Sequence, residues 1–87
     1  MNFQALVEVR LRDGVADPEG ATILSAMRAL GFDGFSQVRS GKSFRLSVEA
    51  EDERQAARMA EEVADRLLAN PVLEVSEVTI LSGAGRP

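Results

Sequence analysis

The chain has 87 residues and a formal net charge of −4, and it contains no cysteine, histidine, tyrosine or tryptophan. This length allows one domain with a small core, and the residue types that most often ligate metals or act as general bases are missing, so no catalytic, metal or cofactor site is expected. The negative charge disfavours nucleic acid as a partner. No apolar run reaches membrane-spanning length and the amino terminus lacks the pattern of a signal peptide. We therefore expect a cytoplasmic protein that binds partners away from the membrane.

Residues 3–12 alternate between apolar and polar side chains, and this two-residue period predicts a strand with one buried face. Leu6 breaks the alternation, because it falls among the polar residues. A single exposed leucine is common, but Leu6 also suits a contact between subunits. It is therefore a candidate interface residue.

Residues 18–30 predict the first helix. Asp17 is placed to cap it, Pro18 suits its first position and Gly31 supplies a stop. Gly20 is unusual, because a glycine in a helix costs up to about 1 kcal/mol relative to alanine. It indicates either a frayed first turn or the close approach of a backbone, a ligand or a partner.

Two further strands are predicted at residues 35–40 and 43–50, joined by a tight hairpin turn at Ser40 and Gly41. The second of these strands alternates cleanly. The first is less regular, and the side that it buries depends on the length of the turn.

Arg39 and Lys42 flank this turn, and Lys42 is the only lysine of the chain. The direction of Arg39 stays open, because it changes with the register of the hairpin. We expect the two cations, with Gly41 between them, at a contact with an acidic partner surface or a phosphate. The alternative is a solubilising hairpin tip.

The second helix is predicted to begin at a capping-box-like pair, Asp52 and Gln55, and to end at Asn70, which precedes a proline. Its apolar residues recur on one face. We interpret its acidic residues as a solvent-exposed helix face and assign them no chemistry.

The last strand is predicted to begin near Val72 or Leu73, with a bulge near residues 76–77 that would bring its apolar residues onto one face. Residues 82–87 contain nothing to bury and predict a flexible tail. A single domain is therefore expected over residues 1–81.

The order of elements, β-α-β-β-α-β, predicts an α+β sandwich of the ferredoxin-like type, with a four-stranded antiparallel sheet and both helices on one face. The other face would be bare, and small proteins with such a face often associate with partners or with themselves. Three functions of this fold are disfavoured by the residues. The bare face lacks the aromatic side chains that stack on RNA bases, paired cysteines for metal transfer are missing, and the first connection is acidic rather than a phosphate cradle.

Three stretches occur in a recognisable order: Asp-Pro-Glu-Gly at 17–20, Val-Arg-Ser-Gly-Lys at 38–42 and Leu-Leu-Ala-Asn-Pro-Val-Leu-Glu at 67–74. Together they resemble the PurS family, the small subunits of bacterial and archaeal phosphoribosylformylglycinamidine (FGAM) synthase. Residues 17–20 alone also resemble the start of the first helix in ACT-like regulatory modules, which bind an amino acid at a dimer interface. That alternative stays open.

The PurS resemblance implies a non-catalytic subunit of de novo purine biosynthesis. In that family a PurL-type synthetase subunit uses ATP and Mg to convert formylglycinamide ribonucleotide (FGAR) to FGAM, and a PurQ-type glutaminase subunit releases the ammonia from glutamine. The PurS-type subunit bridges them and self-associates as a homodimer or a higher oligomer. The candidate partner and interface residues are Leu6, Asp17, Pro18, Gly20, Arg39, Gly41 and Lys42.

Overall fold

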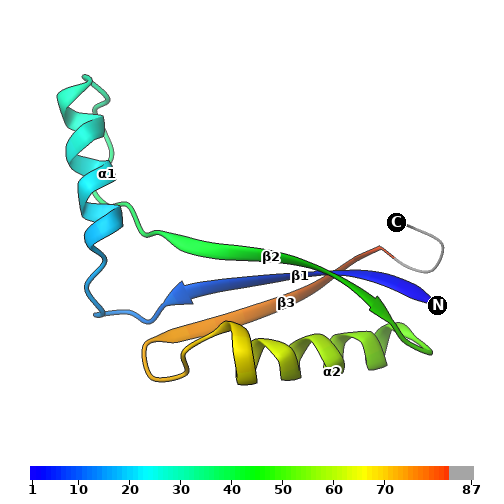
Figure 1. The fold of residues 1–87 in the computed structure, drawn as a ribbon. Coiled ribbons are helices and arrows are strands. Elements are labelled where there is room, and N and C mark those ends of the chain that lie inside the picture. Colours follow the sequence, from blue (N-terminus) through cyan, green and yellow to red (C-terminus); the bar gives the residue numbers. More distant parts are fainter. Residues whose placement is uncertain (83–87) are drawn as a thin grey trace.

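A computed structural model describes residues 1–82. The elements are β1 (Asn2–Leu11), α1 (Pro18–Ala29), β2 (Gly41–Glu49), α2 (Glu53–Val63), the π-helical turn η1 (Ala64–Leu68) and β3 (Glu74–Ser82). The chain is an α+β protein with two main helices and a three-stranded antiparallel sheet, in which β1 lies between β2 and β3 (Figure 1).

One face of the sheet carries the core. The alternation predicted for the first strand is confirmed, since Val7 is fully buried and lies opposite Phe44 on β2 and Val78 on β3. The helix α2 covers this face. It approaches closely because Ala56, Ala60 and Ala64 recur every four residues and are almost completely buried. The core is therefore built from Phe3, Ala5 and valines on the sheet and from alanines on the helical segment.

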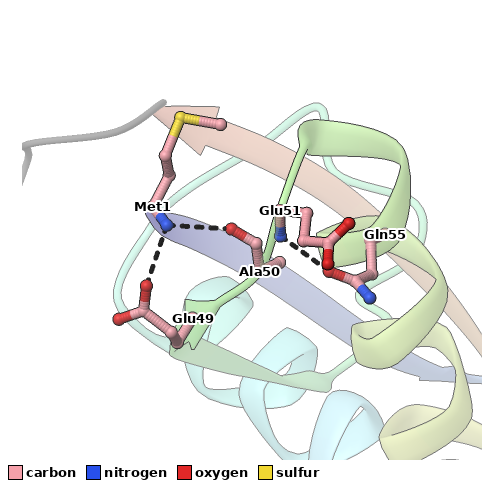
Figure 2. Close-up of polar contacts among 5 residues, drawn as sticks. All are labelled: Met1, Glu49, Ala50, Glu51 and Gln55. Atoms are coloured by element: carbon pink, nitrogen blue, oxygen red, sulfur yellow. Dashed lines mark hydrogen bonds and ion pairs between the residues drawn. The ribbon is translucent and has the colours of Figure 1, made fainter.

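The start of α2 is capped as the sequence predicts. The Asp52 carboxylate accepts a hydrogen bond from the Gln55 N–H at 2.7 Å, and the Gln55 side-chain oxygen accepts from the Glu51 N–H at 2.6 Å. Beside it, the Met1 ammonium donates to the Glu49 carboxylate at 2.8 Å and to the Ala50 carbonyl at 2.9 Å (Figure 2). These contacts fix the chain where it passes from β2 into α2.

The predicted four-stranded sheet is wrong for the single chain, because residues 35–40 form no strand. The hairpin at Ser40 and Gly41 is also wrong, since β2 begins at Gly41 and pairs with β1. The physical reason lies at the base of α1, where the Ser40 N–H donates to the Asp17 carboxylate and the Val38 carbonyl lies against Gly20. This segment is thus held by the helix base and not by a neighbouring strand.

The prediction that both helices cover one face of the sheet is wrong as well. Figure 1 shows α1 projecting from the end of the sheet, away from α2, as an arm that we define as residues 18–40. Gly20 is the one buried residue of α1. The radius of gyration is 16.5 Å, against about 12 Å for a compact domain of this length. The chain has therefore not closed into the predicted sandwich.

The remaining differences are local. Regular α-helix ends at Val63 and continues as the π-helical turn η1, short of the predicted end at Asn70. The irregularity in β3 lies opposite Gln4 and Ala5, not at residues 76–77. Of the predicted tail 82–87, residue 82 closes β3 and residues 83–87 lie outside the described part of the chain.

Candidate functional site

The predicted site residues gather where the arm leaves the sheet, and Asp17 is at the centre of this arm root. One oxygen of its carboxylate, Oδ1, accepts from the Gly20 N–H at 2.9 Å and from the Ser40 hydroxyl at 2.8 Å. The other, Oδ2, accepts from the Ser40 N–H at 2.6 Å. The helix cap predicted for Asp17 is confirmed, with Pro18 in the first turn as expected. The same carboxylate also ties the outgoing helix to the returning chain.

These hydrogen bonds favour the ionised form of Asp17. The pKa of its carboxyl lies below the ordinary value of 3.8, mainly because of the Gly20 N–H, then the Ser40 N–H and hydroxyl, with a smaller contribution from the charge of Arg39. Partial burial opposes the shift. The arm root is thus assembled around a negative charge.

Gly20 is present because a backbone passes close to it. A Cβ atom at this position would lie 2.2 Å from the carbonyl oxygen of Val38 and 2.8 Å from the Asp17 carboxylate. Real Cβ contacts are never this short, so only glycine fits without displacing the chain. Of the readings left open by the sequence, the structure supports the close approach of a backbone.

Arg39 points toward the connection between β1 and α1. Its guanidinium donates to the Val15 carbonyl at 2.8 Å and to the Arg12 carbonyl at 3.1 Å. Arg12 in turn donates to the Pro71 carbonyl at 2.9 and 3.2 Å, and its own N–H donates to the Leu73 carbonyl at 2.8 Å. Hydrogen bonds made by Arg39 and Arg12 therefore connect the arm root to the loop before β3.

Gly41 and Lys42 begin β2 next to this root. A Cβ on Gly41 would lie 2.8 Å from the Val9 carbonyl, so the strands allow no side chain there. The Lys42 ammonium lies 3.8 Å from the Glu74 carboxylate, and its side chain remains 57% exposed. The Glu74 side chain is only 16% exposed, so the ion pair is long and lies at the surface only on its Lys42 side, where the ammonium remains accessible to a partner.

Leu6 lies apart from the arm root, between Arg45 and Thr79 on the sheet face opposite α2. It is half-buried there. The structure thus brings together Asp17, Pro18, Gly20 and Arg39, places Gly41 and Lys42 beside them, and leaves Leu6 on a separate surface.

The sequence patterns did not single out two kinds of residue that the structure shows at or near the site. Arg12 and Ser40 complete the arm root, but their hydrogen bonds cross the chain and leave no local pattern. The other kind is a set of exposed apolar side chains on the arm, of which Ile23 and Leu30 have the spacing of one helical face and Phe35 falls in a predicted strand. They are Ile23, Leu30, Phe32 and Phe35, at 41%, 76%, 55% and 51% exposure.

The described residues of the arm root offer structural contacts and uncovered surface. Within residues 1–82 no three Asp or Glu side chains lie close enough to hold a metal ion. None of the helices in this part of the chain is both long and apolar enough to span a bilayer. A small α+β chain with a clamped, apolar arm that its own core leaves uncovered is built as a subunit of a larger assembly.

Comparisons with known proteins show which family the chain belongs to. The family model described as "PurS: Phosphoribosylformylglycinamidine (FGAM) synthase" matches residues 4–82. The chain belongs to this PurS family. The match favours PurS over the amino-acid-binding module that the sequence left open.

Two relatives and two solved structures illustrate the likeness. The PurS subunit of FGAM synthase from Synechocystis sp. is 42% identical, over 99% of this chain and 88% of that protein, and the PurS subunit from Archaeoglobus fulgidus is 44% identical over 78% and 85%. The crystal structure of Thermotoga maritima PurS matches with a TM-score of 0.87 at 36% identity, covering 93% of each chain. A chain in the structure of PurLQS from the same organism matches with a TM-score of 0.86 at 36% identity, over 93% of this chain and 99% of that one.

Proposed function

We propose that this chain is the bridging subunit of FGAM synthase in de novo purine biosynthesis. It brings a PurL-type synthetase subunit and a PurQ-type glutaminase subunit together, so that ammonia from glutamine is used in the ATP-dependent conversion of FGAR to FGAM. The reaction itself belongs to the partner subunits. A cytoplasmic location is part of this proposal.

The main support for the proposal is the match to a chain of the Thermotoga maritima PurLQS structure. It extends over nearly the whole of both chains, so it includes the arm and its root as well as the sheet. A second match, to PurS of Methanocaldococcus jannaschii, is to a protein described as one of the subunits of formylglycinamide ribonucleotide amidotransferase in the purine biosynthetic pathway. A chain with the same fold and arm has the surface to occupy the same place in an assembly.

The residue types of the chain support the division of labour. Amide hydrolysis by covalent catalysis uses an activated nucleophile, commonly a cysteine beside a base, and this sequence contains neither cysteine nor histidine. Phosphoryl transfer needs phosphate-binding loops and metal-holding carboxylates. We therefore assign glutamine hydrolysis, and the binding of ATP and Mg, to the partners.

Contacts with those partners are proposed at the accessible residues. The Lys42 side chain is 57% exposed and its ammonium lies 3.8 Å from the Glu74 carboxylate, so the ammonium can also approach an acidic group on a partner. Leu6 offers an apolar contact on the open sheet face. Self-association as a homodimer or a higher oligomer belongs to the same proposal, since the arm exposes several large apolar side chains close together in the sequence.

Reconstitution tests this function. Purified chain should show neither glutaminase nor ligase activity by itself. Added to PurL-type and PurQ-type subunits, it should raise glutamine-dependent FGAM formation, while ammonia-dependent formation by the synthetase alone should not require it. Equal glutamine-dependent rates with and without the chain would remove the proposal.

A pair of variants refines the test. Lys42→Ala should raise the concentration of chain needed for half-maximal stimulation, because a partner contact is lost. Arg54→Ala, which removes an exposed positive charge on α2 far along the chain from the arm root, serves as the matched control. If the two variants behave alike, Lys42 is not a partner contact.

A further inference from the structure

A groove lies where the start of β2 meets the base of the arm. Residues 8–10 of β1, residues 39–40 at the end of the arm and residues 41–43 of β2 line it, and its volume is about 350 Å³. Figure 1 shows these three segments at one end of the sheet. Pockets for small ligands begin at about 300 Å³, so the groove has room for a small metabolite.

Positive charge gathers in this groove. Three of the ten cationic side chains of the chain line it, namely Arg10, Arg39 and Lys42, and they face one carboxylate, that of Glu8. The groove therefore has a surplus of two positive charges, whereas the whole chain has a net charge of −4. A local cluster of cations in an acidic chain favours an anion as its ligand.

The charges of the two arginines are not neutralised by an ion pair. Arg39 donates to two backbone carbonyls of the connection before α1, which are uncharged acceptors. No ion pair found within residues 1–82 includes Arg10 or Arg39. Asp17 lies near Arg39, but both of its carboxylate oxygens already accept hydrogen bonds at the arm root. Because a guanidinium has five N–H groups, Arg39 keeps donors for a ligand.

The start of β2 adds further donors to the groove. The Lys42 ammonium lies 3.8 Å from the Glu74 carboxylate, and with 57% of the side chain exposed it can approach a second anion from the solvent side. The Ser43 hydroxyl is a further donor on the lining. Gly41 keeps the groove open, since a Cβ there would lie 3.7 Å from the Arg10 Cβ and would bring a side chain in beside it.

We propose that this groove binds a small, doubly charged oxyanion, either phosphate itself or the phosphate group of a monoester. Two negative charges match the surplus of two positive charges on the lining. Guanidinium and ammonium groups form charge-assisted hydrogen bonds to phosphate oxygens. The inference is independent of the bridging function, because it concerns a small ligand and not a partner subunit.

Such a ligand would join the arm to the sheet. Arg39 stands at the end of the arm, whereas Arg10 belongs to β1 and Lys42 to β2. A ligand that contacts all three binds only while these segments lie together, so it stabilises the arm root by mass action. Hydrogen exchange at the Ser40 amide should therefore slow when the groove is occupied.

Titrations with inorganic phosphate and with ribose 5-phosphate test the site. They are followed by the amide chemical shifts of Ser40, Gly41 and Ser43 at constant ionic strength and about pH 8, where a phosphate monoester carries two negative charges. Both probes should give saturable shifts with a dissociation constant of about 1 mM or lower, as expected for a few charge-assisted hydrogen bonds. Acetate, which carries one charge, should bind at least about tenfold more weakly. Tighter binding of ribose 5-phosphate would support a monoester as the ligand, and tighter binding of phosphate would support the free anion.

Variants of the lining give effects of opposite sign. Arg10→Ala and Lys42→Ala should each raise the dissociation constant about tenfold, because each removes a charge-assisted contact. Glu8→Gln should lower it about two- to fivefold, since it removes the carboxylate that repels the ligand. Arg54→Ala and Glu61→Gln remove the same charges from α2 and should leave binding unchanged. Circular dichroism checks folding, which is expected because all five side chains are exposed.

Three results would overturn the proposal. The first is the absence of saturable shifts with either probe up to about 20 mM, far above the expected constant. The second is equal weakening in Arg54→Ala, because binding would then follow the net charge of the chain and not the groove. The third is a groove that binds neither probe although Lys42→Ala still weakens stimulation of the partner subunits, which would show that it meets an acidic group of a protein. Stimulation is measured in a separate assay, so the bridging function is judged by itself.

Discussion

The carbonyl oxygen of Val38 occupies the place where a side chain on residue 20 would begin, since a Cβ on Gly20 would lie 2.2 Å from it. This contact joins the first turn of α1 to the returning segment of the arm. Together with the carboxylate of Asp17 it determines the direction in which the arm leaves the sheet.

Gly20→Ala should therefore destabilise the arm root. Alanine favours a helix over glycine by up to about 1 kcal/mol, but the clash with a backbone carbonyl costs about 1–3 kcal/mol, so the net effect is unfavourable. Faster cleavage by trypsin at Arg28 and Arg39 would report the loosened arm. Ser25→Ala, an exposed substitution on the same helix, should leave cleavage unchanged or slow it slightly. Slower cleavage of Gly20→Ala than of the original chain would show that helix propensity outweighs the contact.

Acid should loosen the same root through Asp17. Because its folded-state pKa lies below 3.8, its contribution to stability is fully present above the unfolded value and is lost as the pH falls through the lower folded value. Amide chemical shifts of Gly20 and Ser40, followed from about pH 6 to pH 2, should move together below about 3.8. In Asp17→Asn the amide oxygen can still accept from the Gly20 N–H, while the amide nitrogen cannot accept from the Ser40 N–H and no charge titrates, so this shared transition should vanish. Unlinked transitions of the two amides would contradict a common carboxylate acceptor.

Arg39→Lys should weaken the arm root even though it keeps the charge. The guanidinium reaches two carbonyl oxygens, of Val15 and Arg12, with two of its nitrogens, and a single ammonium cannot reproduce this fork. The expected loss is about 1 kcal/mol, because the hydrogen bonds are exposed to water. Hydrogen exchange should accelerate at the Ser40 amide and stay unchanged in β1. If Arg39→Lys exchanges like the original chain while Arg39→Ala does not, the charge alone is sufficient.

The sheet and α2 could be predicted because their patterns are local. Two-residue alternation identifies the buried face of β1, and the pair Asp52 and Gln55 identifies the start of α2. The cap at Asp17 and the unusual Gly20 were visible for the same reason. Each of these signals is contained within a few neighbouring residues.

The direction of the arm could not be predicted from the sequence. The apolar spacing on α1 is the same whether the helix packs on its own sheet or on another surface. Residues 35–40 alternate like a strand, and only the hydrogen bond from Ser40 to Asp17, 23 residues earlier, shows that this segment is held elsewhere. Arg39 likewise needed a partner, Arg12, from a distant part of the chain. Contacts between remote residues decided what the local pattern left open.

The pairing of Arg10 with Gly41 places the exit and the return of the arm side by side on neighbouring strands. Topologically the arm is an insertion into a β-hairpin, and the hydrogen-bond register from Asn2 to Arg10 does not depend on its length. A change of length in the outer part of the arm, between Gly20 and Val38, would therefore leave both the contacts of the arm root and the pairing of β1 with β2 in place. The length of the arm is thus set independently of the register of the sheet.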